Sequence, residues 1–524
     1  MKKVVITTSG TGERLGELTK YTNKSLVKVG DKYAICHIIE SYEEPTEFII
    51  TLGYYGNLVR DFLEMAYPER KIEYVYIDNY VGEGSSLGYS LLKTRHLLQC
   101  PFIFHCCDSI VNASSPLEIN PGVNTLYVSS SSSNSQYASI VKDDNNKVNQ
   151  LNEKKCSLYD YVYIGISYIH DFAAFWDFLK KEYESNTSNQ GLSDVHAIRL
   201  MMQNGVSFDY KITEKWYDTG NPVSYENLKQ AFKPKYEVLE KNNESLCFLD
   251  TGFVIKFIND RVVNEKRVKR GNLLYPHTPK IHQSADHFIK MELVDGTVLS
   301  EVYSDGIIRS LLEWAEDKLW INKDTNLKYI DCCYRFYITK TLGRINDLPF
   351  LNNECDVING LECPNIKTLI DRIPVEWITT DTFVNFHGDF ILENIILSHS
   401  GSFKLIDWRH EFDDQITHGD VYYDLAKLRH NLILNHKNVN NGMFEVGFDK
   451  DHVKVDLKCN FFHVQQLEDF DRFVEERQYD ANKIKMLTAL IWLNMAPLYD
   501  GKFREFLFYF GKYNLYKILL QVRL

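Results

Sequence analysis

A glycine-rich turn close behind the first apolar run carries residues that could bind a phosphate chain. The turn contains Gly10, Thr11 and Gly12, and the cations Arg14 and Lys24 follow it. Glycine turns between a strand and a helix direct backbone N–H groups at an anion. Two cations next to such a turn suit a triphosphate, because they stabilise the charge that develops on a departing pyrophosphate. The glycine spacing fits neither the dinucleotide-binding GxGxxG pattern nor the P-loop pattern.

The same region resembles the sugar-phosphate nucleotidyltransferases. Residues 10–26 are similar to the family signature GxGxRLxxLTxxxPKxL, with Asn23 at the position of the proline. The heptad at 216–222 is close to the family's W-x-D-x-G-T-P signature, and the resemblance covers roughly residues 1–230. The implied reaction is an in-line attack by an acceptor phosphate on the α-phosphate of a nucleoside triphosphate (NTP), with release of pyrophosphate.

The resemblance also implies roles for individual residues. Asp108 and Asp218 would hold Mg²⁺, which prefers an octahedral set of oxygen ligands. A zinc site at 105–108 is disfavoured, because neighbouring residues on a strand point to opposite faces. The other implied residues are the nucleotide-binding Gly10, Thr11, Gly12, Gly84 and Ser85, the phosphate-contacting Arg14 and Lys24, and the acceptor-binding Glu153, Lys154 and Gly165.

A second set of catalytic residue types lies in the C-terminal half. Asp389 is followed five positions later by Asn394, and Asp407 ends a later apolar run. This order and spacing match the catalytic loop and the metal-binding Asp of protein kinases. With Gly388 and Trp408, they resemble more closely the HGD…N…IDW pattern of aminoglycoside phosphotransferases and choline kinases. The resemblance implies that Asp389 accepts the proton of a substrate hydroxyl, while Asn394 and Asp407 hold Mg²⁺ against the ATP phosphates.

Other parts of that family pattern are also present. Lys256 stands in a strand similar to the one whose lysine holds the α- and β-phosphates, with Glu265 as its implied ion-pair partner. Met291 and Leu293 would lie beside the adenine. Residues 419–426 match the family's GDxxxDLA segment, which supports the catalytic loop.

The elements that must position these residues differ between the two halves. In the first half, strand-like apolar runs alternate with helix-like spacing, which predicts βαβ units and a mostly parallel sheet. The second half begins with a β-hairpin at 245–257 and is mostly helical from residue 307. The strand-like runs of the first half are residues 4–7, 47–52, 72–77, 102–105 and 124–129, and its helix-like stretches are 34–42, 55–66 and 86–98.

We therefore predict an α/β protein of two domains. Residues 1–232 would form a Rossmann-like, GT-A-like nucleotidyltransferase domain, which has a mixed sheet with helices on both faces. Residues 245–524 would form a bilobal α+β domain of the protein-kinase-like type, and the polar segment 233–244 would link the two. A length of 524 residues agrees with this prediction, since it is too long for one hydrophobic core.

The overall composition argues against one class of partner and indicates the cellular compartment. A net charge of −12 argues against a nucleic-acid partner, which would need a basic face, but not against NTP and ATP as substrates. The 11 cysteines are scattered without a CxxC motif, which favours free thiols in a reducing compartment. We find no signal or membrane-spanning segment and expect a cytoplasmic protein without membrane insertion. The oligomeric state stays open, a homo-oligomer included.

Together, the two sites predict a two-step activation of a small metabolite. A kinase would phosphorylate a sugar or polyol with ATP, and the nucleotidyltransferase would join that phosphate to a nucleotidyl group from an NTP. One alternative is a choline or amino-alcohol kinase joined to a cytidylyltransferase that uses CTP. A second alternative is an active nucleotidyltransferase with a pseudokinase binding module, because glycine is sparse at 249–252, where the phosphate-covering loop of kinases would lie.

Overall fold

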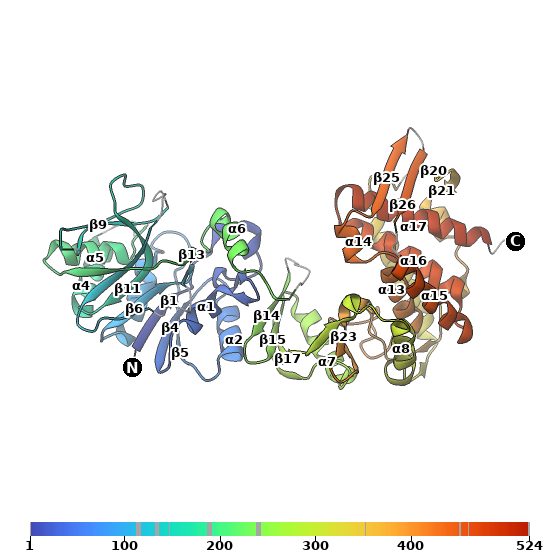
Figure 1. Cartoon of the computed structure of the whole chain (residues 1–524), viewed down its shortest axis with the longest axis horizontal. Helices are drawn as coiled ribbons and strands as arrows, with labels where there is room; N and C mark the ends of the chain where they lie inside the picture. Colours follow the sequence, from blue (N-terminus) through green and yellow to red (C-terminus); the bar gives the residue numbers. More distant parts are fainter. Residues whose placement is uncertain are drawn as a thin grey trace. The chain divides into compact units, whose positions relative to one another are not determined.

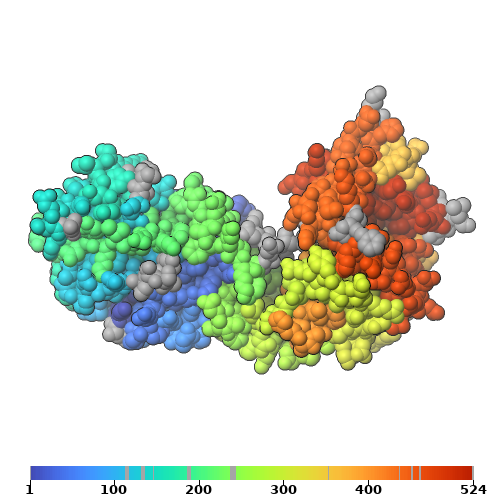
Figure 2. All heavy atoms as spheres, in the orientation of Figure 1, coloured from blue at the N-terminus to red at the C-terminus, as the bar shows by residue number. Residues whose placement is uncertain are grey.

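The chain folds into two compact units. The computed structural model describes residues 2–111, 117–130, 136–145, 147–185, 191–236, 243–351, 353–449, 452–458 and 461–521. The first unit comprises Met1–Arg261 and His282–Met291, and the second comprises Val262–Ile281 and Glu292–Leu524. In Figure 1 and Figure 2 the colours of the first unit run mainly from blue to green, and those of the second mainly from yellow to red.

A nine-stranded mixed sheet forms the centre of the first unit. β1 (Lys2–Thr7) lies between β4 (Thr46–Leu52) and β6 (Phe102–Cys106) and is parallel to both, and β5 (Lys71–Tyr76) continues the parallel part. β11 (Tyr161–Ile169) runs antiparallel to β6 and connects it to the remaining strands. These are β8 (Asn124–Ser129), β9 (Ser139–Lys142), β10 (Val148–Asn152) and β12 (Phe208–Ile212).

Helices cover both faces of this sheet. Side chains alternate along β1, so that Val4 and Ile6 lie in one hydrophobic cluster and Val5 lies in another. Phe62 belongs to the first cluster and Trp176 to the second, which confirms the mixed α/β class predicted for this part of the chain. The helices are α1 (Ala34–Glu40), α2 (Gly56–Ala66), α3 (Leu87–Thr94), α4 (Phe172–Ser185), α5 (Asp194–Gln203) and α6 (Pro222–Ala231).

A smaller sheet shares a hydrophobic core with α1 and α2. β14 (Glu244–Leu249), β15 (Phe253–Ile258) and β17 (Phe288–Glu292) are neighbours in this sheet, and β16 (Ile281–Ser284) follows β17. Phe62 of α2 and Phe288 of β17 pack with their ring centroids 6.0 Å apart. The buried residues that these strands contribute to the cluster of Val4 and Phe62 are Cys247, Leu249, Ile255, Phe257 and Phe288.

Polar contacts join the same elements. The hydroxyl groups of Tyr33 and Ser245 lie 2.7 Å apart, and the ammonium group of Lys290 donates to the carbonyl oxygen of Met65 at 2.6 Å. The first compact unit therefore includes strands that the sequence analysis assigned to the second domain. The domain boundary at 233–244 falls partly outside the described residues and stays a prediction.

The second unit is mostly helical. α13 (Val421–Ile433) packs against α16 (Ala481–Met495), and α16 packs against α17 (Gly501–Gln521). A π-helical turn at Arg335–Thr339 joins α9 (Lys328–Tyr334) to α10. The other helices are α7 (Arg261–Leu274), α8 (Ile307–Trp314), α10 (Lys340–Ile345), α11 (Ile366–Ile370), α12 (Val375–Ile378), α14 (His436–Asn440) and α15 (Phe461–Glu476).

Short sheets of the second unit position the predicted catalytic loop. β18 (Gly296–Val298), β23 (Ile395–Ser398) and β24 (Phe403–Leu405) form an antiparallel sheet. Asp389 and Asn394 precede β23, and Asp407 follows β24. The remaining strands are β19 (Asp324–Thr325), β20 (Cys355–Ile358), β21 (Leu361–Pro364), β22 (Thr382–Phe383), β25 (Phe444–Asp449) and β26 (His452–Leu457). Among the described residues, no helix combines the length and apolarity that crossing a bilayer requires.

Candidate active sites

The structure brings Asp108 and Asp218 together. Asp108 follows β6 and immediately precedes β7 (Ser109–Val111), which pairs antiparallel with β13 (Trp216–Asp218) so that Asp218 lies opposite Ser109. Gly220 stands beside both carboxylates, because a Cβ atom there would lie 2.8 Å from Asp108 Oδ2 and 2.9 Å from Asp218 Oδ1. Two carboxylates that share one small residue can present their oxygens to one cation.

The charges around the two carboxylates differ. Lys24 Nζ lies 3.3 Å from Asp108 Oδ2. Burial disfavours ionisation of Asp108, but the charge of Lys24 outweighs it and lowers the pKa of this carboxyl group to about 2. Burial and the charge of Asp108 raise the pKa of Asp218. Arg14 acts on both carboxyl groups and lowers the pKa of each, so the predicted phosphate-binding cations lie at this site.

Neutral donors hold Asp218 in place. Tyr137 Oη donates to Asp218 Oδ2 at 2.8 Å, and Asn221 Nδ2 donates to the same oxygen at 2.7 Å. The backbone N–H of Gly220 donates to Asp218 Oδ1 at 2.7 Å. Sequence reasoning missed Tyr137, and no local motif could have found it, because it lies about 80 positions before its partner in the sequence.

The glycine turn lies directly against the lysine that follows it. Gly12 has a φ of +68°, and a Cβ atom there would lie 3.0 Å from Lys24 Cβ. Asn23, which stands at the position of the family's proline, is fully buried. Its side-chain amide donates to the carbonyl oxygens of Thr8 at 2.8 Å and Tyr54 at 2.6 Å. The asparagine therefore fixes the loop that carries Lys24 through hydrogen bonds.

Gly84 and Ser85 lie in the loop that precedes α3. Gly84 has a φ of +81°, and Ser85 Oγ donates to the carbonyl oxygen of Gly82 at 2.6 Å. These bonds shape a turn, and the contact of this turn with a nucleotide stays a prediction. Gly10 and Thr11 are part of the turn between β1 and the short helical segment that begins at Glu13.

The predicted acceptor-binding residues lie on two elements of the first unit. Glu153 and Lys154 follow β10, and Glu153 Oε1 lies 2.5 Å from Arg199 Nη1. Gly165 is in β11 with a φ of +75°, and a Cβ atom there would lie 2.9 Å from Cys106 Cβ. A side chain at Gly165 would thus push against the strand that leads to Asp108. The roles of these three residues toward an acceptor stay predictions.

His105 is a core residue. Its Nδ1 lies 2.7 Å from Tyr42 Oη and its Nε2 lies 2.8 Å from the carbonyl oxygen of Ser109. Burial lowers the pKa of His105 to about 4, so the imidazole is neutral near pH 7. Both ring nitrogens are thus engaged by neighbouring groups of the protein core.

The structure also brings together the residues of the second predicted site. Asn394 Nδ2 donates to the carbonyl oxygen of Asp389 at 2.9 Å and to its Oδ2 at 3.1 Å. The backbone N–H of Ile406 donates to the carbonyl oxygen of Asn394 at 2.9 Å, which places Asp407 next to this asparagine. Asp407 has a φ of +52° and forms an ion pair with Arg267 of α7.

Asp424 supports the loop from behind. Its carboxylate accepts hydrogen bonds from the backbone N–H groups of His387 and Gly388, both at 2.7 Å, and from Trp320 Nε1 at 3.1 Å. His387 Nε2 lies 2.9 Å from the carbonyl oxygen of Ile406. The GDxxxDLA segment, to which Asp424 belongs, thus holds the backbone of residues 387 and 388.

Lys427 is a site residue that sequence reasoning missed. Its Nζ lies 2.6 Å from Asp389 Oδ1. Burial opposes the ionisation of both side chains, but their mutual attraction prevails, lowering the pKa of Asp389 and raising that of Lys427. The available signal was position, because Lys427 directly follows the GDxxxDLA segment.

The residues predicted to bind ATP lie on both sides of the unit boundary. Lys256 is buried on β15 with Nζ 3.2 Å from Glu244 Oε2, and Glu265 Oε1 lies 2.8 Å from Lys269 Nζ. The boundary between the compact units passes between Met291 and Leu293. The pairing of Lys256 with Glu265 and the adenine contacts stay predictions.

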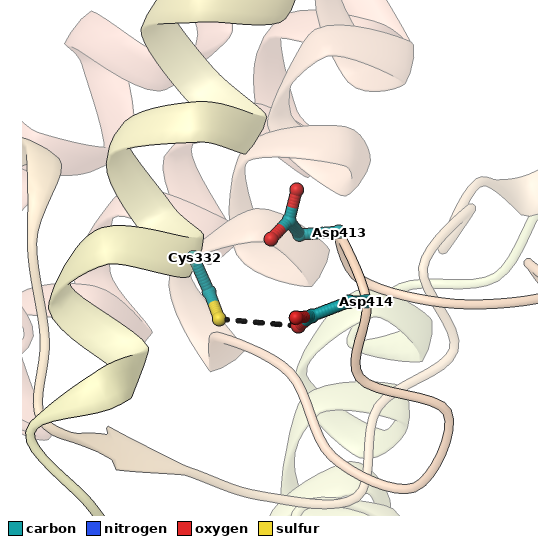
Figure 3. A group of neighbouring side chains, drawn as sticks. All are labelled: Cys332, Asp413 and Asp414. Carbon is teal, nitrogen blue, oxygen red and sulfur yellow. Dashed lines mark hydrogen bonds between the residues drawn. The ribbon is translucent and has the colours of Figure 1, made fainter.

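One further group of side chains has atoms that could bind a metal. Cys332, Asp413 and Asp414 lie together in the second unit, with their ligand atoms within 4.8 Å of one another (Figure 3). Arg335 already pairs with both carboxylates, since its Nε lies 2.9 Å from Asp413 Oδ2 and its Nη2 lies 3.6 Å from Asp414 Oδ2. We therefore assign no metal to it.

Solved structures of nucleotidyltransferases match the N-terminal part of the chain. The CTP:phosphocholine cytidylyltransferase from Streptococcus pneumoniae is 21% identical, with a TM-score of 0.39, and the match covers 44% of this chain and 100% of that one. The inositol-1-phosphate CTP transferase from T. maritima is 17% identical, with a TM-score of 0.36, over 45% of this chain and 98% of that one. A UDP-glucose pyrophosphorylase complexed with UDP-glucose is 17% identical, with a TM-score of 0.36, and the match covers 44% of this chain and 98% of that one. No family model and no curated protein sequence matches the chain.

Proposed function

We propose that the first unit is a Mg²⁺-dependent nucleotidyltransferase that acts on a small phosphorylated acceptor. The observation that supports this most directly is the pair of carboxylates, Asp108 and Asp218, which lie together beside Gly220. Their oxygens are the donors that Mg²⁺ prefers, and Lys24 and Arg14 beside them are suited to the phosphates of an NTP.

In this proposal the chain contributes positioning and charge. Bound Mg²⁺ would neutralise charge on the triphosphate at the reacting phosphorus. The backbone N–H groups of the turn at 10–12 and the side chains of Arg14 and Lys24 would hold the phosphates and stabilise the pyrophosphate as it leaves. Lys154 would hold the acceptor phosphate for in-line attack, so that no protein nucleophile takes part.

Pyrophosphate release tests this proposal. The purified chain is assayed with each of the four NTPs against phosphorylated sugars, polyols and amino alcohols. We expect one pair of substrates to release pyrophosphate and Asp108→Ala to abolish the release. Asp177→Asn, an exposed residue of α4 that pairs with Arg95 at 3.0 Å, is the matched control and should behave as the wild type. Unchanged release by Asp108→Ala would contradict the metal assignment.

We also propose that the second site is a kinase for a small hydroxylated metabolite. The supporting observation is the cluster of Asp389, Asn394 and Asp407 on a loop that Asp424 holds from behind. Asp389 would accept the proton of the acceptor hydroxyl, and Asn394 and Asp407 would hold Mg²⁺ against the ATP phosphates. The product, a phosphorylated metabolite, is the class of substrate that the first site needs.

Mg²⁺-dependent release of ADP tests the kinase proposal. A sugar or polyol acceptor is our first prediction, and the amino alcohols and the pseudokinase are the alternatives. Asp389→Asn should lose activity with every acceptor, and Asp305→Asn, at an exposed position of the same unit, is the control. Binding of ATP without turnover of any acceptor would favour the pseudokinase.

A further inference from the structure

Four cationic side chains gather beside the catalytic loop of the second site. Lys340 Nζ lies 4.4 Å from the centroid of the Phe336 ring, and Arg409 Cζ lies 4.8 Å from the same centroid. Arg344 is one helical turn after Lys340 in α10, so the two share a face of that helix. Lys427 is the fourth member. We call these four residues the cationic cluster.

The cluster lies at Asp389. Lys427 pairs with the Asp389 carboxylate at 2.6 Å. The backbone N–H of Arg409 donates to the carbonyl oxygen of His387 at 3.0 Å, and a Cβ atom on Gly388 would lie 2.5 Å from Arg409 Cβ. Gly388, which has a φ of +84°, thus makes room for Arg409 directly beside the proposed catalytic base.

Three of the four cations have no carboxylate partner in the part of the chain that the structure describes. Arg344 Nη1 donates to the carbonyl oxygen of Asn494 at 3.4 Å, and Arg409 Nε donates to that of Glu411 at 2.8 Å. The nearby Glu411 carboxylate pairs instead with Lys266 Nζ at 2.5 Å. Lys340 lies over the Phe336 ring, and the charge of Glu411 offsets only part of the repulsion from its cationic neighbours.

Mutual repulsion among these side chains disfavours the protonated form of Lys340, which a bound anion would favour. Burial, together with the charges of Arg409, Arg344 and Lys427, lowers the pKa of Lys340 to about 6. Burial and Arg409 also lower the pKa of Arg344, although arginine gives up its proton very reluctantly. Arg344 is exposed and the other three are partly exposed, so a ligand from solution can reach them.

We propose that the cationic cluster binds an anionic group, a carboxylate or a phosphate, on the acceptor that the second site phosphorylates. This inference rests on the proposed kinase function and narrows its substrate class. The acceptor hydroxyl would lose its proton to Asp389, its oxygen would bond to the γ-phosphorus, and ADP would leave with the electrons of the broken bond. A quaternary ammonium or another cationic acceptor would be repelled, and a neutral sugar would leave the charges unmatched.

The test compares acceptors that carry an anionic group with neutral counterparts on the same carbon skeleton, and with a cationic acceptor. ADP release by the full chain is measured with glycerate against glycerol, gluconate against sorbitol, glucuronate and glucose 6-phosphate against glucose, and choline. We expect an anionic acceptor to have a kcat/KM at least about tenfold above that of its neutral counterpart, since charge-assisted bonds are the stronger ones. Preference for a neutral acceptor or for choline overturns the inference but leaves the kinase function standing. Turnover of no acceptor overturns the kinase function, and the inference with it.

Variants of the cationic cluster show whether the anion that it binds belongs to the acceptor or to the nucleotide. Lys340→Gln and Arg344→Gln should each raise KM for the anionic acceptor about tenfold, with KM for ATP unchanged. Lys517→Gln is the matched control, because Lys517 also stacks on an aromatic ring, 5.3 Å from the centroid of Tyr513. A rise in KM for ATP with an unchanged KM for the acceptor would show that the cluster binds the nucleotide phosphates, and would overturn the inference. Thermal unfolding of each variant checks that it folds.

Discussion

The two candidate sites hold the aspartates predicted to act in them in different ways. In both, one aspartate pairs with a lysine, Asp108 with Lys24 in the first unit and Asp389 with Lys427 in the second. The second aspartate differs. Asp218 is held by neutral donors, whereas Asp407 is paired with the cation Arg267.

This difference bears on how each site would take up a divalent ion. Neutral donors orient the carboxylate of Asp218 and leave its charge for the ion, so the first site is preorganised. In the second site, Mg²⁺ would have to compete with Arg267 for Asp407.

The largest expected effect on activity comes from removing the carboxylate of Asp218 or of Asp407, the aspartates that are held differently in the two sites. Asp218→Asn should lower pyrophosphate release about 100-fold or more, because charge stabilisation at the reacting phosphorus is lost, and should leave ADP release unchanged. Asp407→Asn should lower ADP release and leave pyrophosphate release unchanged. Both rates are measured on the same preparation, so each variant serves as the folding control for the other. Loss of both activities in one variant would contradict two separate sites.

A core substitution tests where the first unit ends. Phe288→Ala should destabilise the first unit by about 3–5 kcal/mol, although the sequence analysis placed Phe288 in the second domain, because this ring packs in the cluster of Phe62. Urea unfolding followed by pyrophosphate release measures the change. An unchanged midpoint, with only ADP release affected, would show that the small sheet belongs with the second unit.

Lys340 should make the stability of the second unit depend on pH. Its folded-state pKa of about 6 lies below the ordinary value of 10.5, so between these pH values the unfolded chain binds a proton that the folded chain does not. The free energy of unfolding therefore rises with pH in this window. Since Lys340 is partly exposed, we expect a gain of about 1–2 kcal/mol between pH 6 and 9. Lys340→Gln should flatten this slope, and an equal slope in the variant would be evidence against a neutral Lys340 in the folded chain.

The smallest expected effect tests the competition between Arg267 and Mg²⁺. Arg267→Met should lower the Mg²⁺ concentration for half-maximal ADP release about threefold to fivefold, since a partly buried ion pair contributes on the order of 1 kcal/mol. Lys24→Met in the first site is the comparison, because Lys24 also contributes to binding the phosphates and its loss should slow pyrophosphate release. A higher Mg²⁺ requirement in Arg267→Met would mean that Arg267 helps to bind the nucleotide.

The sequence predicted the central sheet well. The apolar runs at 47–52 and 124–129 correspond to β4 (Thr46–Leu52) and β8 (Asn124–Ser129), because strands buried on both faces are continuously apolar. It also placed Asp108 and Asp218 as partners, since each lies in or beside a motif of fixed spacing. The helix predicted at 34–42 ends earlier, at Glu40, where the chain turns toward β4.

What the sequence could not predict depends on contacts between distant residues. Tyr137 and Arg267 stand in no recognised motif position, and only the folded chain brings them to their carboxylates. The core shared by α2 and β17 was missed for the same reason, because each element is amphipathic by itself and its covering partner is more than 200 residues away. The cationic cluster also draws its members from separate elements, of which α10 and α13 carry three residues.

The core shared by the small sheet and α1 and α2 has a genetic consequence. A gene divided at the codons for residues 233–244 would encode two polypeptides, and each would expose apolar surface that the other covers in the intact chain. Neither product should accumulate in a cell as a stable protein, and expressing the two together should restore activity only where they associate during folding. Natural separation of the two halves into independent genes would need compensating changes at Cys247, Leu249 and Phe288, so the fused arrangement is expected to persist through descent.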